Sequence, residues 1–315
     1  SCPEAVAHEL KNTLFSRVKT RDRKEFPAPV SRDERVLELL ESPELSEQAQ
    51  LATLRSLTEI PTRHSYSREV HYAEAYIKDE LKSLPRLTVE AHKIRFDMSN
   101  NVVARLQGTN DSLSPVVIGT HYDCQNHNVW DKTGRAPGAN ENGTGVAVNL
   151  ALAAALARSS HRLERTVEFH FYTGEEQGYF GSRALAKYYK EQGKDIHAFI
   201  GLDGFGYTAD KYGEIKLGFF PYAYADSLVD FVVNAVDLYI PGLTVDSTPE
   251  CNTANAAWHE NDYDAIGLHG STESCHAYPW RHNVEDTIDK LHLFQLEVLA
   301  QAVLACTAEL AGVSS

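Results

Sequence analysis

Five short segments of this 315-residue chain carry ionisable side chains between glycines and apolar runs. They are His121-Tyr-Asp123, Pro137-Gly-Ala-Asn-Glu141 with Thr144-Gly145, Gly174-Glu-Glu-Gln-Gly178 with Gly181-Ser182, Leu202-Asp-Gly204, and His282-Asn-Val-Glu-Asp-Thr287. Imidazoles and carboxylates are ligands of catalytic zinc, and a carboxylate beside such an ion can take up a proton. Singly, each segment also has a structural interpretation as surface charge, a helix cap or a hydrogen-bonded histidine. Together they indicate one metal-dependent site.

Three of the segments follow expected β-strands. The strands cover residues 116–118, 166–172 and 198–202, and they lead into His121, Gly174 and Asp203. An open α/β sheet binds its ligands outside the carboxyl ends of its strands. We therefore expect His121, the pair Glu175 and Glu176, and Asp203 to converge at one end of a sheet. Asp123 is expected to support the imidazole of His121 and to fix its tautomer.

The rest of the pattern predicts strands that alternate with helices. Helices are expected around 49–57 and 73–81, at 146–157, 182–192 and 228–239, and at 287–310 with Asp286 or Thr287 as its cap; further strands are expected at 215–220 and 265–268. This alternation predicts an α/β fold, a three-layer α/β/α sandwich with a mostly parallel mixed central sheet. Residues 1–45 are predicted to be an N-terminal extension that packs on the body, and residues 46–315 the catalytic domain.

The overall charge restricts the partners. The formal net charge is −14, whereas binding to nucleic acid or an anionic membrane surface requires clustered Lys and Arg. We expect no nucleic acid and no membrane partner, and a substrate with a free ammonium group suits this charge. The longest apolar run, residues 146–157, is shorter than the roughly 20 residues that cross a bilayer. No basic region followed by an apolar one begins the chain, so a secretory signal is either absent or already removed.

The five cysteines (Cys2, Cys124, Cys251, Cys275 and Cys306) are too few and too scattered for a disulfide scaffold, and no C-x-x-C pair indicates structural zinc. Their odd number leaves at least one thiol unpaired within the chain. Cys251 and Cys275 share one loop-rich stretch and are expected to pair if the protein is exported. Buried free thiols are the alternative.

In this order the five segments resemble the zinc-dependent aminopeptidase family of the bacterial leucine aminopeptidase type. These are secreted dizinc exopeptidases, relatives of glutamate carboxypeptidases and glutaminyl cyclases. The family pattern runs His-x-Asp, Pro-Gly-x-x-Asp with Ser-Gly downstream, Gly-Glu-Glu-x-Gly with Gly-Ser, Leu-Asp-Met and His-Thr-x-x-Asp-Thr. The resemblance covers roughly residues 46–312. It implies a zinc-exopeptidase-like fold and a secreted or periplasmic hydrolase that releases the N-terminal residue of peptides with a free N-terminus.

The resemblance also implies a role for each matching residue. The expected metal ligands are His121 and Asp203 for one zinc ion, Glu176 and His282 for the other, and Glu141 as the bridge. Glu175 would be the general base that takes a proton from zinc-bound water, which attacks a carbonyl polarised by the metals. No serine or cysteine nucleophile is then required.

Three departures from the family pattern concern this site. Glu141 replaces a bridging Asp and has one more methylene, so of two zinc ions per chain one is expected to bind weakly. Arg281 stands where some members have an oxyanion-stabilising Tyr, which makes Tyr278 and Arg281 candidates for contacting the substrate. The usual Ser-Asp-His segment, which helps to position the substrate, has no clean counterpart; the nearest match is Asn-Asp-Tyr at residues 261–263, with Tyr in place of His.

Two alternative functions stay open. A glutaminyl cyclase-like acyl transferase uses the same fold with a single zinc ion, also carries His-Tyr-Asp and would tolerate an altered bridge. A catalytically weakened or inactive binding module is the other, with Glu141 as its best support. The metallo-aminopeptidase is preferred, because all five ligand positions keep a side chain that can bind metal.

Overall fold

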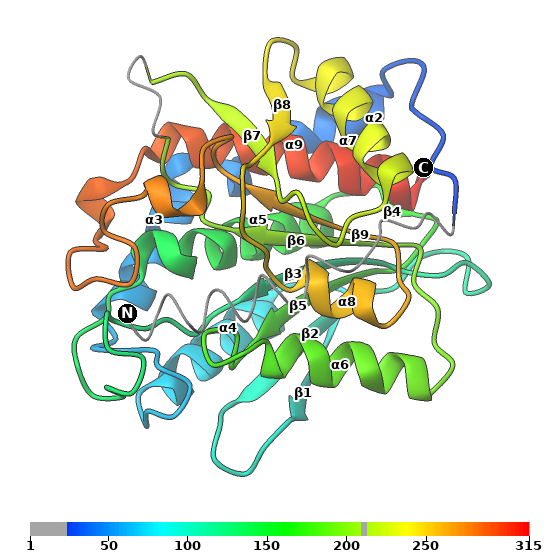
Figure 1. The fold of residues 1–315 in the computed structure, drawn as a ribbon. Coiled ribbons are helices and arrows are strands. Elements are labelled where there is room, and N and C mark those ends of the chain that lie inside the picture. Colours follow the sequence, from blue (N-terminus) through cyan, green and yellow to red (C-terminus); the bar gives the residue numbers. More distant parts are fainter. Residues whose placement is uncertain (1–23, 209–212, 315) are drawn as a thin grey trace.

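Buried apolar runs of the chain form a central β-sheet with helices on both faces (Figure 1). The computed structural model describes residues 24–208 and 213–314. Its strands are β1 (Leu87–Lys93), β2 (Asn100–Leu106), β3 (Val116–His121), β4 (Arg162–Leu163), β5 (Val167–Tyr172), β6 (Ala198–Asp203), β7 (Lys216–Phe219), β8 (Thr244–Ser247), β9 (Ala265–His269) and β10 (Val313–Ser314). Within the described ranges, eight of them form one sheet in the order β1-β2-β5-β3-β6-β9-β7-β8, and β4 pairs with β10.

The centre of the sheet is parallel and its edges are mixed. Strand β3 pairs in parallel with β5 and β6, and β6 with β9. Antiparallel pairing joins β1 to β2, β2 to β5, and β7 to β9. Every residue of β3, β5, β6 and β9 is buried, as is usual for parallel strands covered on both faces. The fold is therefore a three-layer α/β/α sandwich with a mixed central sheet.

The helices divide between the two faces of the sheet. They are α2 (Glu34–Leu40), α3 (Glu47–Glu59), α4 (Val70–Ser83), α5 (Thr144–Arg158), α6 (Phe180–Glu191), α7 (Asp226–Tyr239), α8 (Asn255–Glu260) and α9 (Leu293–Ala311), with short helical turns at Pro43–Leu45, Ala139–Gly143, Cys275–Ala277 and Ile288–Lys290. Helix α5 contacts β3, β5 and β6, and it packs against α3, α4 and α9. Helix α8 contacts β6 and β9 and lies beside α6, as Figure 1 shows.

Helix α9 is long and apolar enough to cross a membrane, but 67% of its most apolar window is buried inside the fold. It contacts α2, α3, α5 and α7. A helix that is buried against four other helices belongs to the hydrophobic core of the fold.

The described part of the N-terminal segment contacts the body. Val36 and Leu39 of α2 are buried, and α2 contacts α9. Lys24 forms an ion pair with Asp195 at 2.9 Å, and the backbone N–H of Asp33 donates to the hydroxyl of Tyr239. Residues 1–23, which form half of the predicted extension, lie outside the described residues, and the boundary between residues 45 and 46 stays a prediction.

The structure differs from the sequence-based prediction at two kinds of place. Strands β1, β2 and β8 and helix α8 were not predicted. Strands β1 and β8 are largely exposed and α8 has only six residues, whereas β2 is mostly buried but begins with two asparagines and contains Arg105. The last helix begins at Leu293 and not at residue 287, because Ile288–Lys290 forms a separate turn. The side chain of Asp286 accepts hydrogen bonds from the backbone of Asn140 and Glu141 and caps no helix.

Candidate metal centre

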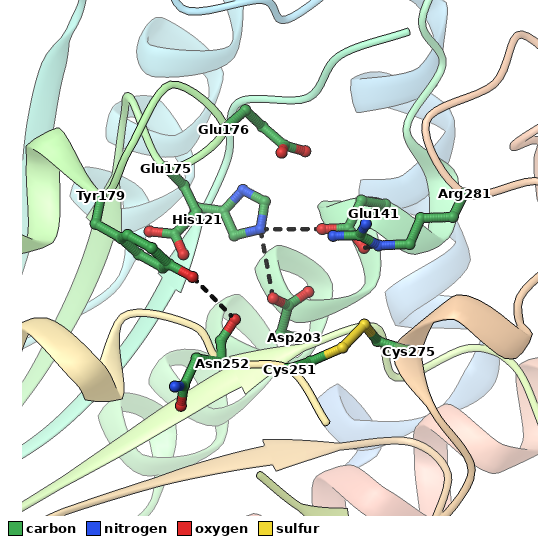
Figure 2. A pocket seen from close by; sticks show the side chains of 10 residues that line it. All are labelled: His121, Glu141, Glu175, Glu176, Tyr179, Asp203, Cys251, Asn252, Cys275 and Arg281. Carbon is green, nitrogen blue, oxygen red and sulfur yellow. Dashed lines mark hydrogen bonds and ion pairs between the residues drawn. A yellow bond between two sulfur atoms is a disulfide. The ribbon is translucent and has the colours of Figure 1, made fainter. Parts of the chain in front are cut away.

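Three neighbouring strands bring the predicted residues together. His121 is the last residue of β3 and Asp203 the last residue of β6, while Glu175 and Glu176 follow the end of β5. The three strands lie in the order β5-β3-β6, so their carboxyl ends open at the same end of the sheet. These residues line a pocket together with Glu141, Tyr179, Cys251, Asn252, Cys275 and Arg281 (Figure 2).

One group of donor atoms comprises His121, Glu141 and Asp203. The imidazole Nε2 of His121 lies 3.4 Å from Glu141 Oε1 and 3.7 Å from Asp203 Oδ2. Tetrahedral zinc holds such ligands at about 2.0–2.2 Å, which puts neighbouring donor atoms about 3.3–3.6 Å apart. Nε2 of His121 and Oδ1 of Asp203 are buried and make no hydrogen bond. These distances and unbonded donor atoms fit a zinc ion.

A second group comprises Glu141, Glu176 and His282, so the two groups share Glu141. Oε1 of Glu176 lies 3.0 Å from Nε2 of His282 but accepts no hydrogen bond. The other carboxylate oxygen, Oε2, accepts a hydrogen bond from the amide of Gln125, which also lies 3.2 Å from Nδ1 of His282. Gln125 therefore orients both side chains and leaves Glu176 Oε1 and His282 Nε2 directed toward each other.

Asp123 connects the two acidic residues to the first histidine. Its carbonyl oxygen lies 3.0 Å from Nδ1 of His121, and its carboxylate lies 3.5 Å from the same nitrogen. The backbone N–H groups of Glu175 and Glu176 donate to its two carboxylate oxygens, and the hydroxyl of Ser65 donates to one of them. This pattern leaves Nε2 of His121 as the nitrogen that faces the pocket, and it fixes the backbone from which Glu175 and Glu176 project.

The turn that carries Glu141 is held by a buried arginine and a buried carboxylate. Gly138 has a φ of 56°, and a Cβ there would meet Cys124 and Arg63. The guanidinium of Arg63 donates to the carbonyls of Pro137 and Gly138 at 2.6 and 2.8 Å. Asp286 accepts from the N–H groups of Asn140 and Glu141 at 2.8 and 3.0 Å. These contacts fix the backbone of Glu141 on both sides of the turn.

The electrostatics of the centre favour bound cations. Burial opposes the charged form of His121, but the neighbouring carboxylates of Asp123, Asp203 and Glu141 raise its pKa well above its ordinary value. Burial also opposes the charge on Glu141, yet the positive charge of Arg281 holds the pKa of that carboxyl well below its usual range. For Asp203, burial and the negative charge of Glu141 raise the pKa. The buried site thus holds several carboxylates and few positively charged groups, and a bound cation would offset this excess of negative charge.

The structure separates the two predicted substrate-contacting residues. Arg281 lines the pocket, and its Nε donates to Oε2 of Glu141 at 3.1 Å. The hydroxyl of Tyr278 donates to Asp286 at 2.6 Å, and Tyr278 is absent from the lining of this pocket in the described part of the chain. Burial raises the pKa of Asp286 to about 6 despite this hydrogen bond. Tyr278 thus supports Asp286 behind Glu141, and Arg281 is the residue that reaches the pocket.

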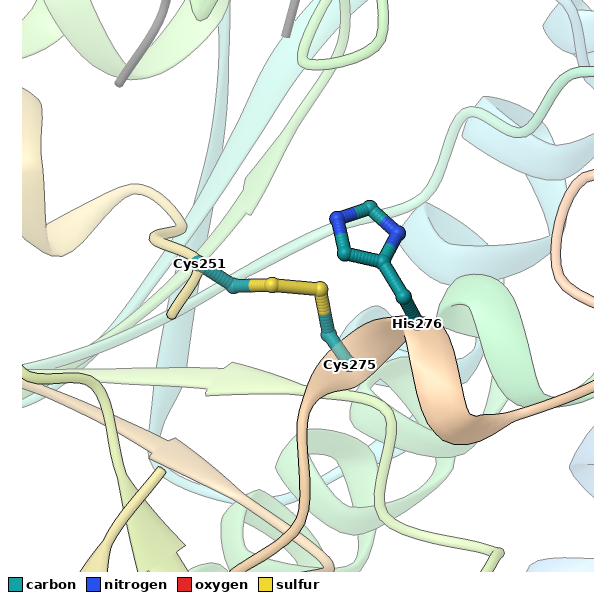
Figure 3. Close-up of side chains that lie close together, drawn as sticks. All are labelled: Cys251, Cys275 and His276. Atoms are coloured by element: carbon teal, nitrogen blue, oxygen red, sulfur yellow. A yellow bond between two sulfur atoms is a disulfide. The ribbon is translucent and has the colours of Figure 1, made fainter. Parts of the chain in front are cut away.

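A disulfide between Cys251 and Cys275 forms one wall of the pocket (Figure 2). It joins the segment that precedes α8 to the turn Cys275–Ala277, beside the exposed His276 (Figure 3). Oxidised sulfurs are not thiolate ligands, so these two cysteines and His276 form no metal site. Cys124 and Cys306 are buried free thiols, and Cys2 lies outside the described residues.

Residues 261–263 do not reach the pocket. They follow the carboxyl end of α8, where Asp262 pairs with Lys190 at 3.1 Å and the hydroxyl of Tyr263 donates to the carbonyl of Lys194. The nearest match to the Ser-Asp-His segment therefore contributes no side chain to this pocket. The pocket receives Asn252, from the segment before α8, and Tyr179, whose hydroxyl lies 3.5 Å from the carbonyl of Asn252.

The sequence motifs did not indicate Arg63, Gln125, Tyr179 or Asn252 as residues of the site. Arg63 and Gln125 lie in loops without a recognisable spacing, and Asn252 is adjacent to a cysteine that only the fold brings to the pocket. Tyr179 had a usable signal, because it directly follows the Gly-Glu-Glu-Gln-Gly segment.

Comparison with known proteins identifies the family and the fold of the chain. A probable leucine aminopeptidase of Arthroderma otae is 31% identical over 217 residues, which cover 67% of this chain and 57% of that protein, so the chain spans little more than half of that relative. The LapA aminopeptidase of Legionella pneumophila has the same fold, with a TM-score of 0.81 and 22% identity over 92% of this chain and 78% of that one. Porphyromonas gingivalis glutaminyl cyclase also shares the fold, with a TM-score of 0.68 and 16% identity over 84% and 98% of the two chains. The description of peptidase family M28 matches residues 101–307, more than half of the sequence, and the chain belongs to this family.

Proposed function

We propose that this chain is a zinc-dependent aminopeptidase that releases the N-terminal residue of peptides. The observation that carries the proposal is the pair of buried donor groups that share Glu141, with the carboxylate of Glu175 in the same pocket. Membership of peptidase family M28 supports hydrolysis of peptide bonds. The name of the Arthroderma otae relative supports removal of an N-terminal residue, with leucine as the first side chain to test.

The proposal assigns two zinc ions to the centre. His121 and Asp203 would hold one, Glu176 and His282 the other, and Glu141 would contact both. When bound, zinc polarises a substrate carbonyl and lowers the pKa of water from about 15.7 to about 7.

The residues around this centre would bind the substrate and move protons. Glu175 would accept a proton at its carboxylate and return it to the amine that leaves. Its backbone N–H donates to Asp123, which fixes the start of the side chain. The carboxylates of the pocket attract the ammonium group of a free peptide N-terminus. The guanidinium of Arg281 would face the carbonyl oxygen on which negative charge develops.

We further propose that the protein works in an oxidising compartment, either outside the cell or in a periplasm. The disulfide between Cys251 and Cys275 supports it, because disulfides persist in such compartments and are rare in a reducing cytosol.

Aminoacyl p-nitroanilides test the activity. Zinc-loaded protein should release the anilide from leucine and other residues with a free amine and should leave the N-acetylated compounds intact. Treatment with 1,10-phenanthroline should abolish release, and added zinc should restore it. No release across the panel would contradict the proposal, and cyclisation of a peptide with N-terminal Gln would assign the site to the cyclase reaction.

A conservative substitution tests the role of Glu175. Glu175→Gln should lower kcat by about 10²–10⁴-fold, because loss of a general base has an effect of this size. Its zinc content should stay that of the wild type. The matched control is Glu191→Gln on the exposed side of α6, which should keep the wild-type kcat. Equal activity of Glu175→Gln and wild type would refute this role.

A further inference from the structure

Arg281 places a positive charge inside the candidate metal centre. Its Nε donates to Oε2 of Glu141 at 3.1 Å, and its side chain is 21% exposed. Figure 2 shows the guanidinium lying against the Glu141 carboxylate, within the same pocket as His121 and Asp203. Guanidinium stays protonated at every pH at which the protein is folded, so this charge is permanent.

The two oxygens of Glu141 face different neighbours. Oε1 lies 3.4 Å from Nε2 of His121, on the side of the first donor group. Oε2 accepts the hydrogen bond from Arg281. A carboxylate that bridges two metal ions directs one oxygen to each of them, so the oxygen available to the second ion is the one that Arg281 already holds.

The arginine also lies next to the second donor group along the chain. It precedes His282, and the negative charges that act on its guanidinium most strongly are those of Glu141 and Glu176, ahead of Asp203. Glu141 and Glu176 are the two carboxylates of the second group. A divalent ion placed there would be repelled by the guanidinium at short range in a partly buried site, where such interactions are strong.

We propose that Arg281 makes the two metal positions unequal. The position formed by His121, Glu141 and Asp203 binds zinc tightly. The position formed by Glu141, Glu176 and His282 binds it weakly, because Arg281 occupies Oε2 of Glu141 and repels the ion. This inference rests on the proposed zinc centre, and it names the weaker position and a cause other than the extra methylene of Glu141.

Stepwise zinc binding tests the inference without an activity assay. The full chain, stripped of metal with a chelator, is titrated with Zn²⁺ against a chromophoric indicator of known affinity. Wild type should show two dissociation constants that differ by at least about tenfold, which corresponds to 1.4 kcal/mol. In Arg281→Met the weaker constant should tighten by tenfold or more, while the tighter constant changes less than threefold.

Further variants assign each step to a position. Asp203→Asn should remove the tight step and Glu176→Gln the weak one. Arg281→Lys keeps a positive charge and should keep the weak step weak, whereas Arg281→Gln, a second neutral variant, should behave like Arg281→Met. The matched control is Arg158→Met, because Arg158 is the last residue of α5, at the end of the helix away from Glu141, and forms an ion pair with Glu44.

The outcomes separate this inference from the proposed function. An unchanged weak constant in both neutral variants, an equal shift of both constants, or loss of the tight step in Glu176→Gln would overturn the inference. Tight zinc binding with the expected response to Arg281→Met, but without release from any anilide, would leave the inference standing and contradict the aminopeptidase.

Discussion

Replacing Arg63 by Met is expected to destabilise the protein strongly, although Arg63 binds no ligand in the proposed mechanism. Its side chain is fully buried and has no carboxylate partner within the described residues. Its guanidinium instead donates to four backbone carbonyls, those of Tyr122, Leu57, Pro137 and Gly138, at 2.6–3.2 Å. Met keeps an apolar side chain of similar length to the aliphatic part of Arg63 and removes all of these donors.

The loss of stability depends on how many carbonyl oxygens have no other hydrogen-bond donor once the guanidinium is removed. Gly138 keeps a second donor, the N–H of Gly143 at 3.0 Å. For Leu57, the residue four positions further along helix α3 is Pro61, which has no N–H to offer. The carbonyls of Leu57, Tyr122 and Pro137 thus lose their donors, at about 1–3 kcal/mol for each buried acceptor. Relief from burying a charge offsets part of this sum, which leaves a loss of about 3–5 kcal/mol.

Urea unfolding of the metal-free protein, followed by circular dichroism and tryptophan fluorescence, measures this loss. Arg135 is the matched control, because it donates to the carbonyls of Thr58 and Ile60 at the same helix end but is exposed. Arg135→Met should cost less than about 1 kcal/mol, since water replaces its hydrogen bonds. If Arg63→Met and Arg135→Met lower the free energy of unfolding equally, the reasoning from buried carbonyls is wrong.

Three further outcomes are expected. Burial and the charges of Arg165 and Lys24 lower the pKa of His197 to about 4. The stability that its neutral form contributes is therefore present above pH 6.5 and is lost as the pH falls toward 4. Between these pH values the free energy of unfolding of His197→Gln should fall by about 1–2 kcal/mol less than that of wild type, after discounting for the partial exposure of the side chain. Burial raises the pKa of Cys124 to about 11 and of Cys306 to about 12, so iodoacetamide at pH 7 should label both in urea and neither in the native protein, as peptide mass spectrometry would report. Gln295 is fully buried and donates to the carbonyls of Phe205 and Gly270, so Gln295→Leu should lower the free energy of unfolding by about 2–3 kcal/mol, several times the effect of Gln301→Leu at a half-buried position.

The central strands could be predicted from the sequence because strands buried on both faces consist of runs of apolar residues. Strands β3, β5 and β6 are buried along their whole length, and a run of apolar residues that ends in a polar side chain marks both the strand and the place where it opens to a ligand. Strand β1 has no such run, because its residues are exposed or half-buried and mostly polar. The antiparallel edge formed by β1 and β2 followed only from the three-dimensional structure.

The residues that support the centre could not be predicted for a different reason. Asp286 stands just before an expected helix, where a carboxylate usually caps the first turn, yet its oxygens bind the backbone of the Glu141 turn more than a hundred residues earlier in the chain. Arg63 is of a residue type that normally lies on the surface, and only the fold shows that its neighbours are unpaired carbonyls. Contacts between distant segments leave no periodicity in the sequence.

The pairing of β3 with β6 sets how far apart the first two candidate ligands lie. Thr120 is paired with Leu202, so His121 and Asp203, one residue further on, project from adjacent strands, which any sheet spaces about 4.8 Å apart. This separation comes from backbone hydrogen bonds and is independent of the loops around the pocket. Loops can therefore change in length and composition, and with them the shape of the pocket, while these two donors keep their distance. A slip of β6 by a single residue would turn Asp203 to the opposite face of the sheet, so the ligand pair tolerates substitution of its surroundings but not a change of register.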